Sequence, residues 1–214
     1  MDQETYLNKR QERQLPRLKM FMDVVFAIML WRIFMHLPRL NDYPEAESIW
    51  QLITFEPDRM VMVLVGVFFI VTYWVQNNRL FSHVVRTDGK HTTISIIQLF
   101  FLLIYLYSVA LGIRFDDDLT AMLMQSVSLA CVGFMALWGW GYAVAKKTLI
   151  DPDMPEDNVP YMKVTILPEP ITACLTIPFA FVGQLAWDIA WLVYPVISLL
   201  VKMYINAHTK GDSA

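Results

Sequence analysis

Hydrophobic and polar residues form long blocks along this chain rather than short alternating periods. Six apolar runs, at 20–37, 60–77, 93–112, 120–145, 169–184 and 186–205, are separated by polar segments. A helix of about 20 apolar residues crosses the roughly 30 Å hydrocarbon core of a bilayer, and most of the runs approach that length. The pattern therefore predicts an all-α membrane protein with six transmembrane helices.

The fifth and sixth runs leave an alternative open. Pro178 and Pro195 each lack a backbone donor and kink the helix that holds them, so these runs could instead be one broken element. Before them, the segment Asp151–Pro170 is rich in proline and acidic residues. It cannot be a continuous helix, and we expect a loop at 146–168 between the fourth and fifth helices.

Composition agrees with a membrane protein and excludes several other classes. Of 214 residues, 56% are hydrophobic and 17% charged, and the mean hydropathy is +0.42, so there is no room for a sizeable soluble domain. The net charge of -3 provides no basic surface for nucleic acid. Cys131 and Cys174 lie in apolar runs and are expected to be packing residues. Residues 1–19 are polar and lack the apolar stretch of a cleavable signal.

The distribution of basic residues predicts the orientation, because cytoplasmic loops are enriched in Lys and Arg. With the N-terminus inside, 13 of the 17 basic residues fall on the cytoplasmic side: Lys9, Arg10, Arg13, Arg17, Lys19, Arg79, Arg86, Lys90, Lys146, Lys147, Lys163, Lys202 and Lys210. The outer segments hold only Arg39, Arg59 and Arg114, beside eight acids. We therefore expect a cytoplasmic arm at 1–19, a six-helix domain at 20–206 and a cytoplasmic tail at 207–214.

Ionisable residues inside membrane helices are costly and mark candidate functional positions. These are Asp23 and Arg32 in the first predicted helix and Asp188 at the start of the sixth. The second predicted helix returns to the depth of Asp23 with a polar cluster formed by Gln76, Asn77, Asn78 and Arg79. The spacing suggests a polar network at the inner interface, although ordinary snorkelling residues would give the same pattern.

The segment RLKMFMDVVFAI, residues 17–28, resembles the R-x-x-x-F-S-D motif that opens helix one in the transmembrane protein 175 family. YWVQNNRLF, residues 73–81, resembles the second signature of that family, a Tyr-Trp followed by an Asn-His-His-like cluster. Here Met22 replaces the family Ser, and Gln76, Asn77 and Asn78 replace the Asn and two His. The likeness continues over nearly the whole chain, and the family consists of endolysosomal and bacterial potassium channels.

The resemblance implies roles for residues of the first two helices. It implies an inner network of Arg17, Phe21, Asp23, Trp74, Gln76, Asn77, Asn78 and Arg79. It also implies that helix one lines a pore with an apolar constriction at Ile28. Two stripes could face the axis: Ile28, Arg32 and Met35, or Ile28, Trp31 and Met35.

By this resemblance the chain is expected to be a potassium channel, a homotetramer of the bacterial inner membrane with no cofactor. An alternative is a non-selective or non-conducting sensor that signals to a cytosolic partner through residues 1–19 and 146–168. An enzyme is not expected, because no phosphate-binding Gly loop, HExxH motif or nucleophile elbow is present. No pair of histidines at i, i+4 suggests a metal site.

Arg32 is the residue that sets this chain apart from an ordinary cation channel. It lies close to the outer end of the predicted first helix, and Asp188 is expected at a similar depth. We expect Arg32 either to pair with Asp188 or reach the outer interface, or to face the pore. Four pore-facing guanidinium groups would oppose potassium passage.

Overall fold

The computed structural model describes residues 3–39, 41–115, 117–155 and 157–209. The described residues form helices and connecting segments, with one isolated antiparallel bridge between Val84 and Ile150. The helices are α1 (Gln3–Phe34), α2 (Ile49–Thr54), α3 (Pro57–Ser82), α4 (Gly89–Arg114), α5 (Leu119–Ala145), α6 (Asn158–Ile166), α7 (Pro168–Ala180), α8 (Gln184–Trp191) and α9 (Val193–Thr209). The all-α prediction is confirmed.

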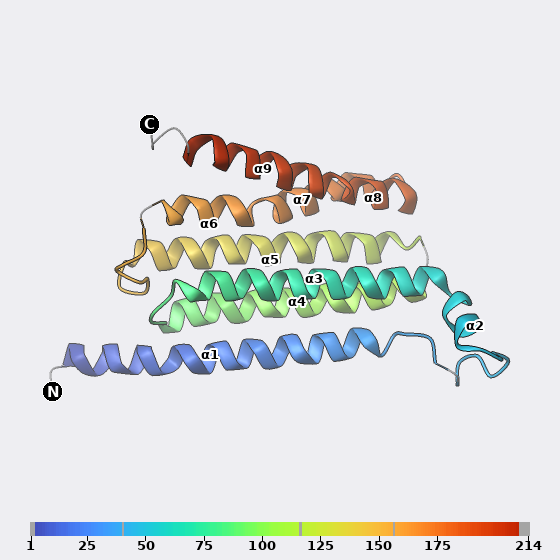
Figure 1. Cartoon of the computed structure of the whole chain (residues 1–214), viewed down its shortest axis with the longest axis horizontal. Helices are drawn as coiled ribbons and strands as arrows, with labels where there is room; N and C mark the ends of the chain where they lie inside the picture. The colour runs from blue at the N-terminus through green and yellow to red at the C-terminus, as the bar shows by residue number, and fades with distance from the viewer. Residues whose placement is uncertain (1–2, 40, 116, 156, 210–214) are drawn as a thin grey trace.

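The helices form a flat bundle of antiparallel rods (Figure 1). α1, α3, α4 and α5 are single rods, whereas α6 continues into α7 and α8 into α9. The beginning of α1, the end of α9 and the connections at 83–88 and 146–157 lie at one end of the bundle. The short helix α2, which the hydrophobic pattern did not predict, lies at the opposite end.

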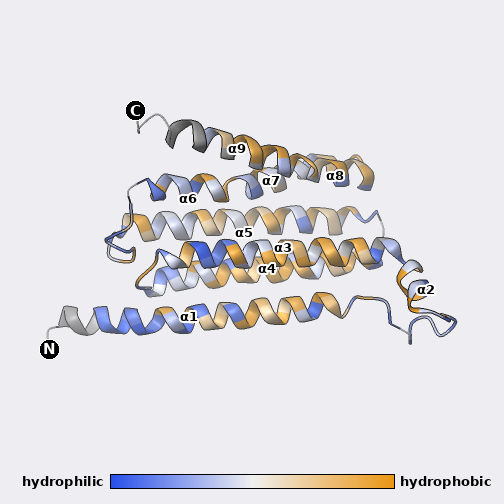
Figure 2. Ribbon diagram, viewed as in Figure 1, coloured by the Kyte–Doolittle hydropathy of each residue, from blue (hydrophilic) through white to orange (hydrophobic). Residues whose placement is uncertain are grey.

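Among the described residues, four segments are long and apolar enough to cross a membrane: Arg59–Ser82, Gly89–Arg114, Leu119–Ala145 and Gln184–Val201. The count of six spans therefore stays a prediction. α1 falls short because its first half is polar, and α7 because it has only 13 residues. Figure 2 shows the change along α1 from hydrophilic to hydrophobic residues.

The expected loop at 146–168 is partly wrong, since it contains helix α6. Pro160 lies in the first turn of α6, and Pro168 and Pro170 lie in the first turn of α7. Backbone N–H groups in a first turn have no intrahelical acceptor, so proline is tolerated there. The prolines thus stand at the starts of two helices that meet at Leu167, and they do not prevent the segment from being helical.

The last two predicted helices are also interrupted. α7 ends two residues after Pro178, and Gly183 then takes a φ of 132°, a conformation that L side chains rarely adopt. α8 ends at Trp191 and α9 begins at Val193. Pro195 has no N–H to donate to the carbonyl of Trp191, which accounts for the second interruption.

The centre of the bundle is the packing of α4 on α5 and of α5 on α7. A Cβ atom at Gly133 of α5 would lie 2.6 to 2.8 Å from three ring carbons of Pro170, so only glycine allows this approach. Further along, the hydroxyls of Ser126 and Thr176 are 2.7 Å apart, and the indole N–H of Trp187 donates to Ser126 over 2.9 Å. Side-chain hydrogen bonds therefore join α5, α7 and α8.

Candidate functional site

Helix α1 presents two faces of similar composition and opposite exposure. Its buried face packs on α3 and α4 and consists of Leu15, Leu18, Met22, Phe26, Met29 and Ile33. Its other face is apolar but exposed: Ile28 is 58%, Trp31 68% and Met35 37% accessible. An exposed apolar stripe on a helix needs either lipid or a partner surface to cover it.

The buried residues fix the direction in which the two sequence-predicted stripes point. Trp31 lies two positions from both Met29 and Ile33, which places it about 160° around the helix from each. Arg32 lies only about 60° from Met29 and about 100° from Ile33. Trp31 therefore points away from the bundle, while the exposed Arg32 lies on the flank of α1.

A hydrogen bond ties α1 to α3 at the depth predicted for the inner network. The indole N–H of Trp74 donates to Oδ1 of Asp23 over 2.9 Å. Asn77 and Asn78 line the same small crevice, together with Met22. The structure thus brings four of the predicted network residues to one place: Asp23, Trp74, Asn77 and Asn78.

The remaining predicted network residues lie elsewhere. Arg17, Phe21 and Arg79 are exposed, and no ion pair joins Arg17 to Asp23 among the described side chains. At about 100° per residue, the six positions between Arg17 and Asp23 place them on different faces of α1. Gln76 faces α7 instead, against Glu169.

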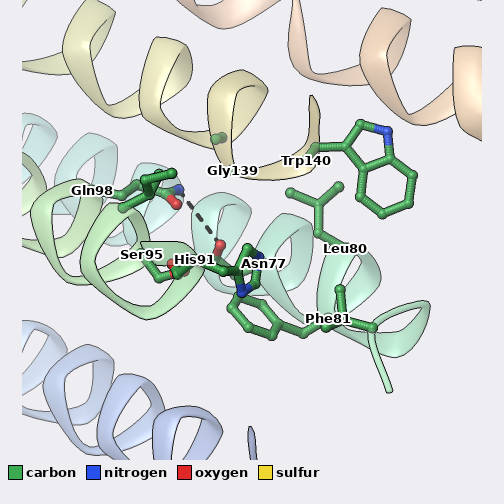
Figure 3. A pocket seen from close by; sticks show the side chains of 11 residues that line it. Asn77, Leu80, Phe81, His91, Ser95, Gln98, Gly139 and Trp140 are labelled. Carbon is green, nitrogen blue, oxygen red and sulfur yellow. Dashed lines mark hydrogen bonds between the residues drawn. The ribbon is translucent and has the colours of Figure 1, made fainter. Parts of the chain in front are cut away.

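Asn77 also connects α3 to α4. The amide of Gln98 donates to Oδ1 of Asn77 over 3.5 Å, at the edge of a small pocket (Figure 3). Buried His91 and Ser95 line this pocket as well. Its volume of about 20 Å³ suits a single water molecule.

The outer pair predicted from the sequence is not formed within this chain. α1 packs on α3 and α4, α8 packs on α5, α7 and α9, and α1 and α8 lie on opposite sides of the bundle (Figure 1). The hydrophobic pattern predicts only the depth of Arg32 and Asp188 in the membrane. Depth does not decide which helices are neighbours.

Arg32 instead belongs to a basic cluster with His36, Arg39 and Arg59 at the end of α1. Arg32, Arg59 and Arg39 all interact electrostatically with His36. Arg39 donates to the carbonyl of Met35 over 3.0 Å, and Arg59 pairs with Glu56 at 2.6 Å. The cluster concentrates positive charge beside the exposed stripe of α1.

The polar first half of α1 is anchored by the connection between α3 and α4. Arg86 forms an ion pair with Glu12 at 3.1 Å, and the N–H of Thr87 donates to the carbonyl of Gln11 over 3.4 Å. The described part of the predicted N-terminal arm is therefore a helical continuation of α1 that packs against the rest of the chain.

Asp88 holds the same end of the bundle together. Its Oδ1 caps α4 through the N–H of His91, and its Oδ2 accepts from the Tyr142 hydroxyl over 2.7 Å and from Nζ of Lys146 over 2.9 Å. Burial raises the pKa of Asp88, but these hydrogen bonds and the Lys146 charge outweigh it, and the net pKa lies below 3.8. Asp88 thus joins α4 to the end of α5.

Sequence reasoning missed one buried acid, Glu169 at the start of α7. It is 3% exposed, and its carboxyl oxygens have no hydrogen-bond partner among the described residues. Pro168 and Pro170 on either side suggested a loop boundary and concealed it. The available signal was the place of this acid at the start of the apolar run at 169–184.

Comparison with known proteins finds similarity to a family model and to solved structures. Residues 17–105 match the family model described as the endosomal/lysosomal potassium channel TMEM175. The fold is similar to that in the crystal structure of a variant of the potassium channel MtTMEM175 in complex with a Nanobody-MBP fusion protein. The TM-score is 0.62 with 14% sequence identity, covering 91% of this chain and 93% of the other. No curated protein sequence matches this chain.

The family match begins at Arg17, runs through Asp23 and Trp74 and ends at Tyr105 in α4. It therefore includes both segments on which the sequence resemblance rests. The matched family and the similar structure are ion channels and not enzymes, in agreement with the expectation that this chain is no enzyme. The resemblance of this chain to the transmembrane protein 175 family is confirmed, by the family match over residues 17–105 and by a shared fold.

Proposed function

We propose that this chain is a subunit of a potassium-conducting channel in a bacterial inner membrane. It acts as a homotetramer of six-span subunits, with both termini in the cytoplasm and lipid around the assembly. The family match, described as a potassium channel, supports the ion, and the distribution of basic residues supports the orientation.

The observation that carries this proposal is the exposed apolar face of α1. Ile28, Trp31 and Met35 cover the side of α1 that faces away from its own bundle. If four copies place α1 at a common axis, these side chains meet and form an apolar constriction. A hydrophobic constriction can gate conduction by excluding water.

The position of Arg32 supports cation passage. Arg32 lies about 100° around α1 from Trp31 and about 40° from Ile28, so its guanidinium lies to one side of the axis when Trp31 faces it. The basic cluster then surrounds the outer mouth rather than the constriction. Its charge lowers the rate of cation entry without closing the pore.

The hydrogen bond between Trp74 and Asp23 holds the pore-lining helix in register with α3. Asn77 extends this contact to Gln98 of α4. The inner network therefore consists of Asp23, Trp74 and Asn77 with Asn78 beside them. Arg17, Phe21 and Arg79 remain available on the surface for lipid headgroups or neighbouring subunits.

Single-channel recording in liposomes tests the function. We expect potassium currents from the wild type and a change in unitary conductance in Ile28→Ala. Ile189→Ala is the matched control, because Ile189 of α8 has the same side chain and 56% exposure. Equal conductance in all three proteins would contradict the assignment of Ile28 to the constriction.

A purified, folded oligomer that carries no current under a potassium gradient would contradict the channel itself. That result would favour a sensor with a cytosolic protein partner, for which the anchored first half of α1 offers the surface. Selectivity is tested by reversal potentials in potassium chloride gradients. Anion selectivity that disappears in Arg32→Gln would place Arg32 on the axis and overturn potassium as the ion.

A further inference from the structure

Glu169 is a buried acid to which the proposed pore gives no role. It lies in the first turn of α7, is 3% exposed, and neither carboxyl oxygen has a hydrogen-bond partner in the described part of the chain. The hydroxyl of Tyr73, on the completely buried side of α3, is likewise without a partner there. Two unpartnered polar groups in one interior are unusual, because each carries a desolvation cost.

The groups acting on Glu169 come from two other helices. Tyr73 and Gln76 of α3 face its carboxyl, and Tyr194 of α9 interacts with it electrostatically. Tyr105 of α4 lies behind Tyr73. Within the described side chains, no basic group is among them, neither Lys163 of α6 nor Arg79 of α3.

The helix backbone prevents Glu169 from moving away to water. Pro168 and Pro170 fix the backbone on both sides, and the Pro170 ring is in contact with Gly133 of α5. A carboxylate held in such a place would be an uncompensated buried charge. It needs either a cation or a proton to neutralise it.

We propose that Glu169, Tyr73 and Gln76 form a buried proton-binding site between α3 and α7. The bound proton converts the carboxylate into a carboxylic acid, whose O–H can donate to the Gln76 carbonyl oxygen. The Tyr73 hydroxyl can donate to the other carboxyl oxygen. All three unpartnered atoms are then satisfied, without a change of backbone and without a positive side chain.

A proton suits this site better than a metal ion. A potassium or sodium ion needs several oxygen ligands and a cavity to hold it, and neither of the two pockets described around α3 includes Glu169. The site is also close to the tether of α1, since Tyr73 directly precedes Trp74 on α3. Loss of the proton would therefore disturb the turn of α3 that carries the indole bonded to Asp23.

Infrared spectroscopy of the detergent-solubilised full chain tests the site directly. We expect a protonated-carboxyl stretch in the wild type at neutral pH and its loss in Glu169→Gln. Tyr73→Phe removes one hydrogen bond to the carboxyl, so it should shift this band without abolishing it. Glu47→Gln, at an exposed acid between α1 and α2, is the control and should leave the band unchanged.

The pH dependence of the unfolding midpoint provides a second measurement. As pH rises, the unfolded chain releases the proton of Glu169, whereas the folded chain either keeps this proton or buries a charge. The unfolding midpoint of the wild type should therefore fall as pH rises. Glu169→Gln should lose this part of the pH dependence, and Glu47→Gln should retain it. A wild type without the infrared band at neutral pH would overturn the proposal. A second outcome would also overturn it. If potassium chloride or sodium chloride raised the unfolding midpoint of the wild type at constant pH but not that of Glu169→Gln, the site would hold a cation.

Discussion

The contact between α1 and α3 and the contact between α5 and α7 are built differently. Both contain a glycine that lets two helices approach, but Gly66 of α3 faces the end of the Ile33 side chain, whereas Gly133 of α5 faces the rigid ring of Pro170. α1 is held to α3 by the partly exposed bond between Trp74 and Asp23. The α5–α7 contact is supported by the buried pair of Ser126 and Thr176.

The difference lies in how much of each contact is completed within this chain. α4, α5 and α7 bury their contacts within one subunit, while α1 buries one face and leaves an equally apolar face uncovered. A helix with such a face gains stability from neighbours outside its own subunit. We therefore expect the α5–α7 contact to determine folding and the α1–α3 contact to determine assembly and conduction.

The largest effect is expected from Gly133→Ala. The new methyl group would lie less than 3 Å from three carbons of the Pro170 ring, which cannot rotate away. Overpacking of this kind costs about 1 to 3 kcal/mol. Thermal unfolding of the purified protein measures it.

The control for this substitution is Gly141→Ala on the same helix. No atom lies within 4 Å of a Cβ at Gly141, and alanine is the better helix former. Its midpoint should equal or exceed that of the wild type. A similar loss of stability in both variants would show that the α5–α7 contact is not specially tight.

Trp74→Phe should have the next largest effect and should act on α1. It removes the donor to Asp23 and keeps an aromatic ring, and a hydrogen bond to a charged group is worth about 1.5 to 3 kcal/mol before solvent screening reduces it. We expect a weaker oligomer and altered conductance, with a small change in the unfolding of the single subunit. Size-exclusion chromatography and liposome recordings measure both.

Trp138→Phe on the exposed surface of α5 controls for loss of an indole. It should leave oligomer and conductance unchanged. If Trp74→Phe instead lowers the subunit's stability as much as Gly133→Ala does, the two contacts have the same role and the comparison fails.

Gly66→Ala should cost less than the about 1 to 3 kcal/mol that is typical of overpacking. The added methyl group would lie 2.7 Å from Cδ1 of Ile33, the mobile end of a side chain that can change rotamer. Thermal unfolding of this variant and of Gly133→Ala compares the loss of stability at the two contacts directly. A cost equal to that of Gly133→Ala would mean that Ile33 cannot adjust and that α1 is held as rigidly as α7.

The smallest effect is expected from Asp88→Asn, at the end of the bundle common to both contacts. The folded pKa of Asp88 lies below 3.8, so its charge contributes stability above pH 3.8 that is lost as pH falls through the folded pKa. Asparagine retains the helix cap but not the charge. The variant should lose less stability than the wild type on acidification below pH 4, in a pH series of unfolding midpoints.

Much of the fold follows from the hydrophobic pattern because each long apolar run is dominated by one helix. The second, third and fourth runs correspond to α3, α4 and α5, which begin a few residues before them or next to them. Asp88 and Asp118 cap the starts of α4 and α5. α6 was not predicted, since proline at a helix start and proline in a loop look alike without the structure. Trp74 and Asp23 were predicted to be neighbours from the paired motifs and are bonded.

The failures concern lateral position and burial. Arg32 lies on α1 and Asp188 on α8, on opposite sides of the bundle (Figure 1), because hydropathy gives depth but not the order of helices around a bundle. Glu169 is buried by α3 and α9, which are distant in sequence. Its environment follows from tertiary packing, which local pattern does not contain.

The apolar part of α1 has a consequence for bilayer thickness. From Met20 to Phe34 it rises about 22 Å, whereas the hydrocarbon core is about 30 Å thick. In contact with lipid, such a short helix would create hydrophobic mismatch, met by thinning of the surrounding membrane. In the oligomer proposed above, the longer helices α3, α4 and α5 of several subunits would screen α1 from lipid and avoid this deformation. The shortness of its apolar part would then favour an inner position and would let water reach deep into both ends.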